Sequence, residues 1–432
     1  MCRASASRYR LNLRRLVALR VVSSRPSTSL TLRSQSGGGA GLAASSVLSA
    51  GDDHDFRLRL FENHMTRRLC GARASMSHHQ QAKTEDRMSI HKVAFRVFAL
   101  CAATISWSPS ATAAQPPILR EQGSFFINGE VVRTENPGGQ APGGRVVVNQ
   151  MYVEYSVPKR QNPAALPIIM VHGSGHTGKT YDTTPDGRDG WKQFFLRKGY
   201  TVYVVDHAGR ARSGWNPEAI NQAQTKGDAG LIPKSGIVQF TYERAWGVFR
   251  FGPKPDEWWP DSKFPKEHLD QYMSQLVPNS EVTLRQSPQP TVSALIALLD
   301  KIGPAMLMVH SQSGTYGTQT ALARPDLLKG YINVEGRTGC NLTPDQVKIM
   351  ARVPWLNVAG DHNWNGDAEC RAATSLVSDA GGKAAFLATY EKGVRGNTHM
   401  MMMDINNLQV ADWILDWIKQ NVGAARSKSA RK

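Results

Sequence analysis

Residues 306–314 read MLMVHSQSG, an uninterrupted apolar run that ends in a turn of small residues. The apolar run predicts a buried strand, and the residues that follow the turn, as far as Ala323, favour a helix. A hydroxyl at a sharp turn from strand to helix is exposed to substrate beside a helix N-terminus, as covalent acyl transfer requires. The stretch therefore predicts a serine nucleophile, which is either Ser311 or Ser313.

The turn fits two registers because it departs from the usual G-x-S-x-G pattern. Ser311 keeps a His before it, a Gly three residues after it and the strand end at Val309. Ser313 instead has a small residue two positions away on either side, Ser311 and Thr315. We expect Ser311 to be the nucleophile, with the backbone N–H of Gln312 as an oxyanion donor, and Ser313 to be the alternative nucleophile. A helix N-cap is the non-catalytic interpretation of either serine.

Short apolar runs recur on both sides of this turn, with helical stretches between most of them. They cover residues 168–171, 202–205, 306–309, 332–334, 356–359 and 386–390. Continuous apolar strands that alternate with helices predict an α/β fold, a mostly parallel sheet with helices on both faces. Residues 145–157 alternate in polarity and predict an antiparallel strand pair, and residues 406–420 carry the apolar stripe of a final helix.

Two turns after these runs carry further motifs. Residues 168–173 read IIMVHG, a strand followed by His-Gly, and residues 206–213 read DHAGRARS. In this order they resemble the turns that follow the third and fourth strands of α/β hydrolases, and the 306–314 turn resembles the nucleophile elbow of that superfamily. The resemblance implies an α/β-hydrolase fold and assigns the backbone N–H of Ser174 to an oxyanion hole.

Residues 173–180 read GSGHTGKT and match the P-loop pattern G-x-x-x-x-G-K-[ST] letter for letter. A P-loop needs a helix that starts at its Lys-Thr pair, so that helix N–H groups meet phosphate. Pro185, Gly187 and Gly190 follow instead and predict turns. Nucleotide binding through Gly173–Thr180 is therefore the minor alternative.

The base and the acid of a serine hydrolase are expected in the later part of the chain. Residues 396–400 read GNTHM between the last strand and the last helix, where the superfamily carries its histidine, so we expect His399 to be the base. Glu335 and Asp361 each follow one of the two strands after the nucleophile turn. Spacing alone leaves both open as the acid.

The motifs HSQSG, VEG and GNTHM, with Glu335 24 residues after Ser311, resemble a small group of secreted bacterial esterases that carry a Glu after the sixth strand. The resemblance runs from about residue 145 to residue 420. It implies a triad of Ser311, Glu335 and His399, with Asp361 as the alternative acid. It also implies hydrolysis of a small-molecule carboxylic ester through an acyl-enzyme, without a metal or an organic cofactor. An acyltransferase on the same fold is the alternative function.

The formal net charge of +17 is concentrated at the front of the chain. Residues 1–87 carry 15 Lys+Arg against 6 Asp+Glu and lack a sustained apolar period, which predicts a disordered or mis-assigned extension. Residues 88–113 combine a basic start, a short apolar run and an Ala-Thr-Ala site, which predicts a signal peptide, export to the periplasm or the medium, and no membrane anchor. Because the hydrolase domain, residues 114–432, has no dense basic run before residue 426, we expect no nucleic-acid partner.

Removal of that leader would leave Cys340 and Cys370, an even pair that predicts one disulfide in an oxidising compartment. Residues 216–290 interrupt the strand-helix alternation with Trp and Phe residues interleaved with Pro. We interpret this insertion as a cap whose aromatic side chains, Trp258 and Trp259 among them, line the pocket and set acyl selectivity. Packing of an irregular loop is the alternative.

Overall fold

The computed structural model describes residues 116–136, 142–232, 238–283, 290–362 and 364–422. The predicted extension (1–87), the predicted signal peptide (88–113) and the basic run at 426–432 lie outside the described residues.

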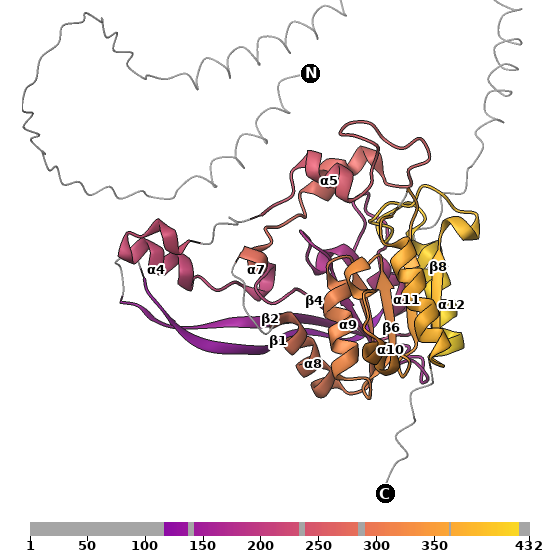
Figure 1. Ribbon diagram of the computed structural model, residues 1–432, viewed down its shortest axis with the longest axis horizontal. Coiled ribbons are helices and arrows are strands. Elements are labelled where there is room, and N and C mark those ends of the chain that lie inside the picture. The colour runs from indigo at the N-terminus through magenta and orange to yellow at the C-terminus, as the bar shows by residue number, and fades with distance from the viewer. Residues whose placement is uncertain (1–115, 137–141, 233–237, 284–289, 363, 423–432) are drawn as a thin grey trace, which may run out of the picture. The chain divides into compact units, whose positions relative to one another are not determined.

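Within this part of the chain, eight strands form one sheet in the order β1-β2-β4-β3-β5-β6-β7-β8. Their bounds are β1 (Leu119–Thr134), β2 (Gly144–Pro158), β3 (Ile168–Val171), β4 (Val202–Val205), β5 (Ala305–His310), β6 (Leu328–Val334), β7 (Trp355–Ala359) and β8 (Ala384–Ala388). Strands β3 to β8 run parallel to one another, and β1 and β2 add to one edge in antiparallel pairs. The predicted mostly parallel sheet is confirmed (Figure 1).

Helices cover both faces of the sheet because each central strand buries side chains on both sides. Ile168 and Met170 of β3 face a core shared with α3 and α12, whereas Ile169 and Val171 face a second core shared with α8. The helices are α3 (Trp191–Arg197), α4 (Glu218–Lys226), α5 (Tyr242–Val248), α6 (Leu269–Met273), α7 (Ser280–Thr283), α8 (Pro290–Ile302), α9 (Ser313–Ala323), α10 (Pro344–Met350), α11 (Asp367–Asp379) and α12 (Asn407–Asn421). No described helix is both long and apolar enough to cross a membrane.

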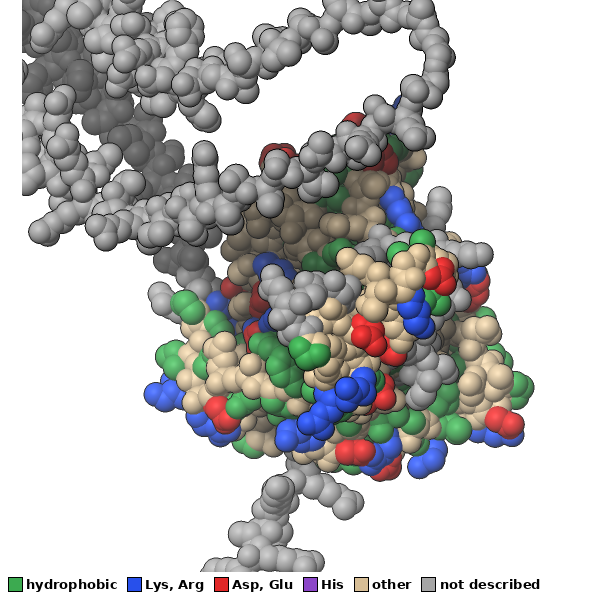
Figure 2. All heavy atoms as spheres, turned by 90° about the vertical axis from the view of Figure 1, so that its left-hand side faces the viewer, with side chains coloured by type: hydrophobic (Ala, Val, Ile, Leu, Met, Phe, Trp, Pro, Cys, Tyr) green, Lys and Arg blue, Asp and Glu red, His purple; other side chains and the backbone are tan. Residues whose placement is uncertain are grey.

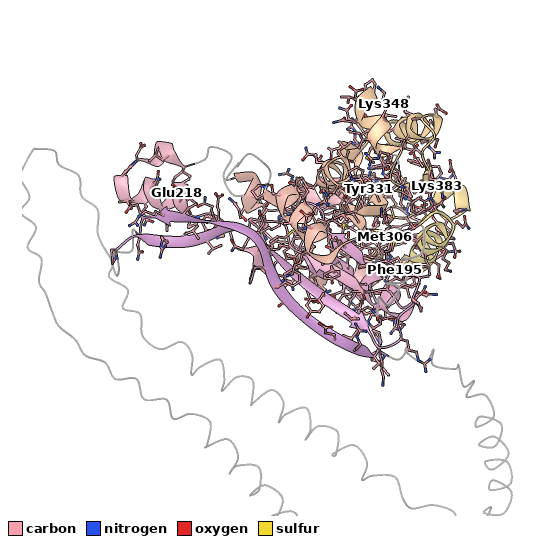
Figure 3. The ribbon with its side chains drawn as sticks, turned by 90° about the horizontal axis from the view of Figure 1, so that it is seen from below. Phe195, Glu218, Met306, Tyr331, Lys348 and Lys383 are labelled. Atoms are coloured by element: carbon pink, nitrogen blue, oxygen red, sulfur yellow. A yellow bond between two sulfur atoms is a disulfide. The ribbon has the colours of Figure 1, made fainter. Side chains whose placement is uncertain are left out.

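Strand β2 occupies the stretch for which we predicted a strand pair, and that prediction was wrong. Residues 145–157 belong to one long strand, whose partner β1 was not identified from the sequence. Asn128 and Gly129 lie inside β1 with φ of 59° and 98°. An Asn-Gly pair usually marks a hairpin turn, so it conceals a strand that continues through it. Figure 3 shows the β1–β2 ribbon extending beyond the sheet to α4, where Glu218 is labelled.

The remaining elements follow the sequence closely. The last strand ends at Ala388 instead of residue 390, because Tyr390 begins a short 3-10 turn. The predicted final helix is α12, shifted by one residue at both ends. The predicted disulfide joins Cys340 after β6 to Cys370 in α11, with the two Cα atoms 5.0 Å apart.

The insertion at residues 216–290 lies between β4 and β5 and carries α4 to α7. Its aromatic side chains pack mainly against one another, since Trp246, Phe251, Phe264 and Tyr272 are all buried and in ring contact. In Figure 1, α5 lies above the sheet, and α4 lies at the far end of the ribbon. The insertion therefore shares one apolar core with the sheet face covered by α3 and α12, and Ala245 and Trp246 of α5 belong to that core.

Charged side chains of both signs are interspersed on the face shown in Figure 2.

Candidate active site

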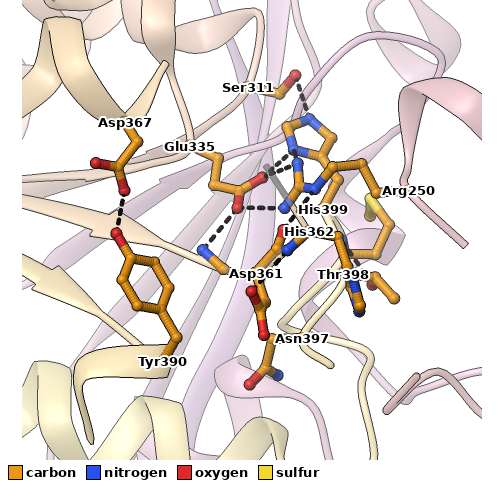
Figure 4. Close-up of polar contacts among 12 residues, drawn as sticks. Arg250, Ser311, Glu335, Asp361, His362, Asp367, Tyr390, Asn397, Thr398 and His399 are labelled. Carbon is orange, nitrogen blue, oxygen red and sulfur yellow. Dashed lines mark hydrogen bonds and ion pairs between the residues drawn. The ribbon is translucent and has the colours of Figure 1, made fainter. Parts of the chain in front are cut away.

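Three side chains from separate loops meet at the carboxyl ends of the strands. Ser311 follows β5, Glu335 follows β6, and His399 lies on the loop between β8 and α12. His399 Nε2 lies 2.8 Å from the Ser311 hydroxyl oxygen, and His399 Nδ1 hydrogen-bonds to the Glu335 carboxylate (Figure 4). The arrangement orients a general base between a hydroxyl and a carboxylate, which is what activation of a serine requires.

Ser311 has the backbone of a nucleophile elbow. Its φ is +54°, in the left-handed region that is unfavourable for a residue with a Cβ, and its N–H donates to the Val334 carbonyl at 3.0 Å. The Gly173 backbone lies so close to this turn that a Cβ at position 173 would lie 2.8 Å from His310 Nδ1 and 2.9 Å from the Ser311 Cβ. A glycine at position 173 is therefore needed for the elbow and the His-Gly loop to sit together.

Ser313, the alternative nucleophile, faces away from this centre. It is fully buried, its hydroxyl donates to the His172 carbonyl at 2.5 Å, and it lies 2.7 Å from His207 Nε2. Within the described residues its hydroxyl has no contact with His399. Ser313 therefore holds the His-Gly loop against the start of α9, and the geometry favours Ser311.

Glu335 is buried, with both carboxylate oxygens occupied. Oε1 accepts from the Gly360 N–H at 2.7 Å and from Arg250 Nη2 at 2.5 Å, and Oε2 accepts from Arg250 Nη1 at 2.8 Å as well as from His399. Burial by itself raises the pKa of Glu335, but Arg250 and His399 outweigh it and lower the pKa to about 2. Glu335 is thus a carboxylate at neutral pH.

Asp361, the alternative acid, lies next to this centre but points elsewhere. Its carboxylate accepts from the Gly396 N–H at 3.2 Å and lies 3.5 Å from Arg395. Its backbone carbonyl accepts from Arg250 Nε at 2.9 Å, and Arg250 in turn contacts Glu335. The geometry therefore favours Glu335 over Asp361.

Arg250 was missed by sequence reasoning. It lies 85 residues before Glu335, in the insertion just after α5, and no motif marks it. Only the folded chain brings it to the carboxylate.

The loop that carries His399 is held by buried polar contacts. Asp404 accepts from the Thr398 N–H and the Thr398 hydroxyl, both at 2.8 Å, and from the Asn397 amide at 2.9 Å. Burial raises the pKa of Asp404 to about 7 despite these hydrogen bonds. The His399 N–H in turn donates to the Phe249 carbonyl at 3.0 Å. The backbone that carries the His399 imidazole is therefore held by Asp404 and by the Phe249 carbonyl.

The predicted oxyanion donors lie in the same cavity as the triad. Ser174 and Gln312 line it together with Ser311 and His399, and neither backbone N–H donates a hydrogen bond within the described residues. The side chains of both are fixed instead: Asn279 donates to the Ser174 hydroxyl at 2.8 Å, and buried Arg210 donates to the Gln312 amide oxygen at 3.0 Å. Two free N–H groups beside the nucleophile suit a developing oxyanion.

The cavity has a volume of about 850 Å³ and is walled by the insertion on one side. Gly247, Val248 and Arg250 line it from the insertion, and Tyr316 and Trp364 line it from the sheet side. Neither of the two tryptophans that we expected to wall the pocket lines it. Trp258 packs on Trp246 and Phe264, and Trp259 stacks on His362. The prediction that these two residues line the pocket was wrong, because Trp258 packs partly buried against the core that the insertion shares with the sheet, and Trp259 is held against His362.

The P-loop alternative has no support in the structure. Residues 178–181 form a single 3-10 turn rather than the start of an α-helix. The Gly178 N–H donates to Asp206 at 2.7 Å, and the Lys179 ammonium donates to the Thr183 carbonyl at 2.5 Å. The groups that would cradle a phosphate are thus used within the fold.

Among the described residues, Asp261, Asp361 and His362 place one potential metal-ligand atom each within 4.8 Å of the others. His362 Nε2 already lies 3.0 Å from the Asp261 carboxylate. The cluster is explained by this pairing and by the Asp361 contact to the Gly396 N–H.

Comparison with known proteins adds two relatives, although no family model matches the chain. A fungal protein (strain ATCC 74256) named probable secreted lipase phiG is 31% identical over 333 residues, which cover 64% of this chain and 88% of that protein. A solved structure described as a novel bacterial esterase is 40% identical, covers 71% of this chain and 98% of its own, and superposes with a TM-score of 0.66.

Proposed function

Because this chain belongs to the α/β-hydrolase family of esterases and lipases and is a carboxylic ester hydrolase, we propose that Ser311, His399 and Glu335 form its catalytic triad. The observation that carries the proposal is the continuous contact from the Ser311 hydroxyl through His399 to Glu335, 2.8 Å at its first step. Each group lies at the carboxyl end of a different strand, in the position its role requires.

In the first half-reaction, His399 takes the proton of the Ser311 hydroxyl as its oxygen attacks the ester carbonyl carbon. The N–H groups of Ser174 and Gln312 hold the oxyanion of the tetrahedral intermediate. Protonated His399 then gives its proton to the leaving alcohol, and an acyl-enzyme remains on Ser311. Glu335 keeps the proton of His399 on Nδ1, so that Nε2 faces the serine.

In the second half-reaction, water replaces the alcohol. His399 deprotonates the water as it attacks the acyl carbonyl, and the carboxylic acid leaves as Ser311 regains its proton. An acyltransferase would use an alcohol at this step, but both relatives are named for ester hydrolysis. A cavity of about 850 Å³ is the size of a small-molecule site, so we expect small-molecule esters as substrates.

We also propose that the protein is exported. The fungal relative is named a secreted lipase, and the buried disulfide suits an oxidising compartment. Sequencing the N-terminus of the protein recovered outside the cytoplasm would test the predicted signal peptide, with a start at Ala114 as the expected result. Recovery only from the cytoplasm with residues 88–113 still attached would contradict export.

A fluorophosphonate, which reacts covalently with activated serines, tests the triad directly. We expect the label on Ser311 in the wild type and no label in S311A. In S313A the label should stay on Ser311 and the protein should lose stability, because His207 and the His172 carbonyl lose a buried partner. Label on Ser313, or none on folded wild-type protein, would remove the proposed triad.

A further inference from the structure

We propose that Arg250 is a positioning residue for ester hydrolysis. It holds the Glu335 carboxylate in the orientation that faces His399 and thereby makes the triad depend on the docked insertion. The inference rests on the proposed triad and assigns a role to a residue outside it.

Arg250 and Glu335 form a bidentate salt bridge. Nη1 and Nη2 of the guanidinium donate to Oε2 and Oε1 of the carboxylate at 2.8 Å and 2.5 Å, and both side chains are almost entirely buried. A planar guanidinium matches a carboxylate in two parallel hydrogen bonds, which fixes the plane of the carboxylate as well as its position. The same plane decides whether Oε2 points at His399 Nδ1.

Both the backbone and the guanidinium of Arg250 are held in place. Its backbone has a φ of 56°, a conformation that costs energy for a residue other than glycine, and its Nε donates to the Asp361 carbonyl at 2.9 Å. All three guanidinium nitrogens therefore have acceptors on the two loops that follow β6 and β7. Strain of this kind is retained where surrounding contacts demand one conformation.

Phe249, the residue before Arg250, contacts His399. The Phe249 carbonyl accepts from the His399 N–H at 3.0 Å, and the Phe249 ring lies parallel to the imidazole with the centroids 6.1 Å apart. Two consecutive residues after α5 thus hold His399 and Glu335 respectively. Undocking of this segment would release both.

Arg250 also lies close to the base itself, because its Nη1 is 3.4 Å from His399 Nδ1. Its guanidinium therefore contacts both members of the pair that would activate Ser311.

The test compares R250A, R250K and R371A by steady-state hydrolysis of a soluble short-chain ester. Arg371 is the matched control, since it pairs with Asp367 and Glu391 and does not line the cavity. We expect R250A to lose kcat by about 10- to 100-fold, the range of a hydrogen bond to a charged group, with little change in KM. R250K should lose less kcat than R250A, because lysine keeps the positive charge and loses only the bidentate hydrogen bonding. R371A should match the wild type.

Two readouts separate positioning from a purely structural role. Millimolar methylguanidinium should restore kcat in R250A, should leave kcat of R371A unchanged, and should not restore kcat in E335Q. In a double-mutant cycle, R250A should cause no further loss in an E335Q background, because Arg250 acts through that carboxylate.

A folded R250A with wild-type kcat would overturn the inference, as would a full additional loss in the double mutant. If R250A does not fold by circular dichroism, R250K decides: reduced kcat supports the inference and wild-type kcat overturns it. Absence of label on Ser311 in the wild type would instead overturn the proposed triad, so the two failures are distinct.

Discussion

His310 Nε2 donates to the backbone carbonyl of His399 at 2.9 Å, which ties the residue before the nucleophile to the residue proposed as the base. The two imidazole rings lie 4.6 Å apart, and His310 is fully buried. The link explains how loops 88 residues apart keep Ser311 and His399 in hydrogen-bonding contact.

Replacement of His310 by Phe keeps a ring in this space but removes the hydrogen bond. We expect kcat to fall by about 3- to 10-fold with little change in KM, the effect of one neutral hydrogen bond on the position of the base. Steady-state kinetics check this, with H268A as the control because His268 is exposed. Unchanged kcat in folded H310F would show that the link does not position the base.

The protein should lose stability as pH falls below about 6.5, the ordinary pKa of histidine. Burial lowers the pKa of His176 to about 3 and holds the pKa values of His172, His207 and His310 well below the usual value. These groups stay neutral when folded and take up protons when unfolded, so stability is present above about pH 6.5 and is lost below it.

Each buried histidine contributes up to about 1.4 kcal/mol per pH unit. Asp404 has the opposite effect on stability. Because burial raises its pKa to about 7, it binds a proton more readily in the folded protein, and this offsets the contribution of about one of the four buried histidines. Urea unfolding between about pH 7 and about pH 5 should show the free energy of unfolding decreasing. A flat profile would contradict the buried neutral imidazoles.

Selectivity for acyl length should respond to Val248 and not to the tryptophans of the insertion. Val248 lines the cavity and is 44% exposed, so V248W should fill space and reduce hydrolysis of long acyl esters relative to short ones. Replacement of Trp258 and Trp259 by Ala should lower stability without changing that ratio. Rates on an acyl-length series measure it, and a changed ratio in the tryptophan variant would restore the role first expected from the sequence.

The Cys340–Cys370 disulfide should stabilise the fold without contributing to chemistry. It closes a loop with a sequence separation of 30, for which chain entropy gives about 3 to 4 kcal/mol. The double variant C340A/C370A should therefore unfold at lower urea concentration and keep kcat at temperatures where it is folded. An unchanged unfolding midpoint would show that the crosslink constrains little of the unfolded chain.

Local patterns were sufficient for most of the fold. Each parallel strand buries both faces, so its apolar run stands out in the sequence, and the small-residue turn after β5 predicts a serine nucleophile at Ser311 or Ser313. The β1–β2 ribbon was misassigned because half-buried strands carry a weaker signal and an Asn-Gly pair inside β1 imitates a turn.

The sequence by itself determined the order of strands and turns, and with it the candidates for nucleophile, base and acid, since these depend on residues adjacent in the chain. Only the tertiary structure decided that Ser313 is buried against His207, that Asp361 turns away from His399, and that Arg250 holds Glu335. Those outcomes depend on how the insertion between β4 and β5 and the loops at the carboxyl ends of the strands pack together. Contacts between residues so distant in sequence form by burial and charge pairing in the folded chain, and no local pattern encodes them.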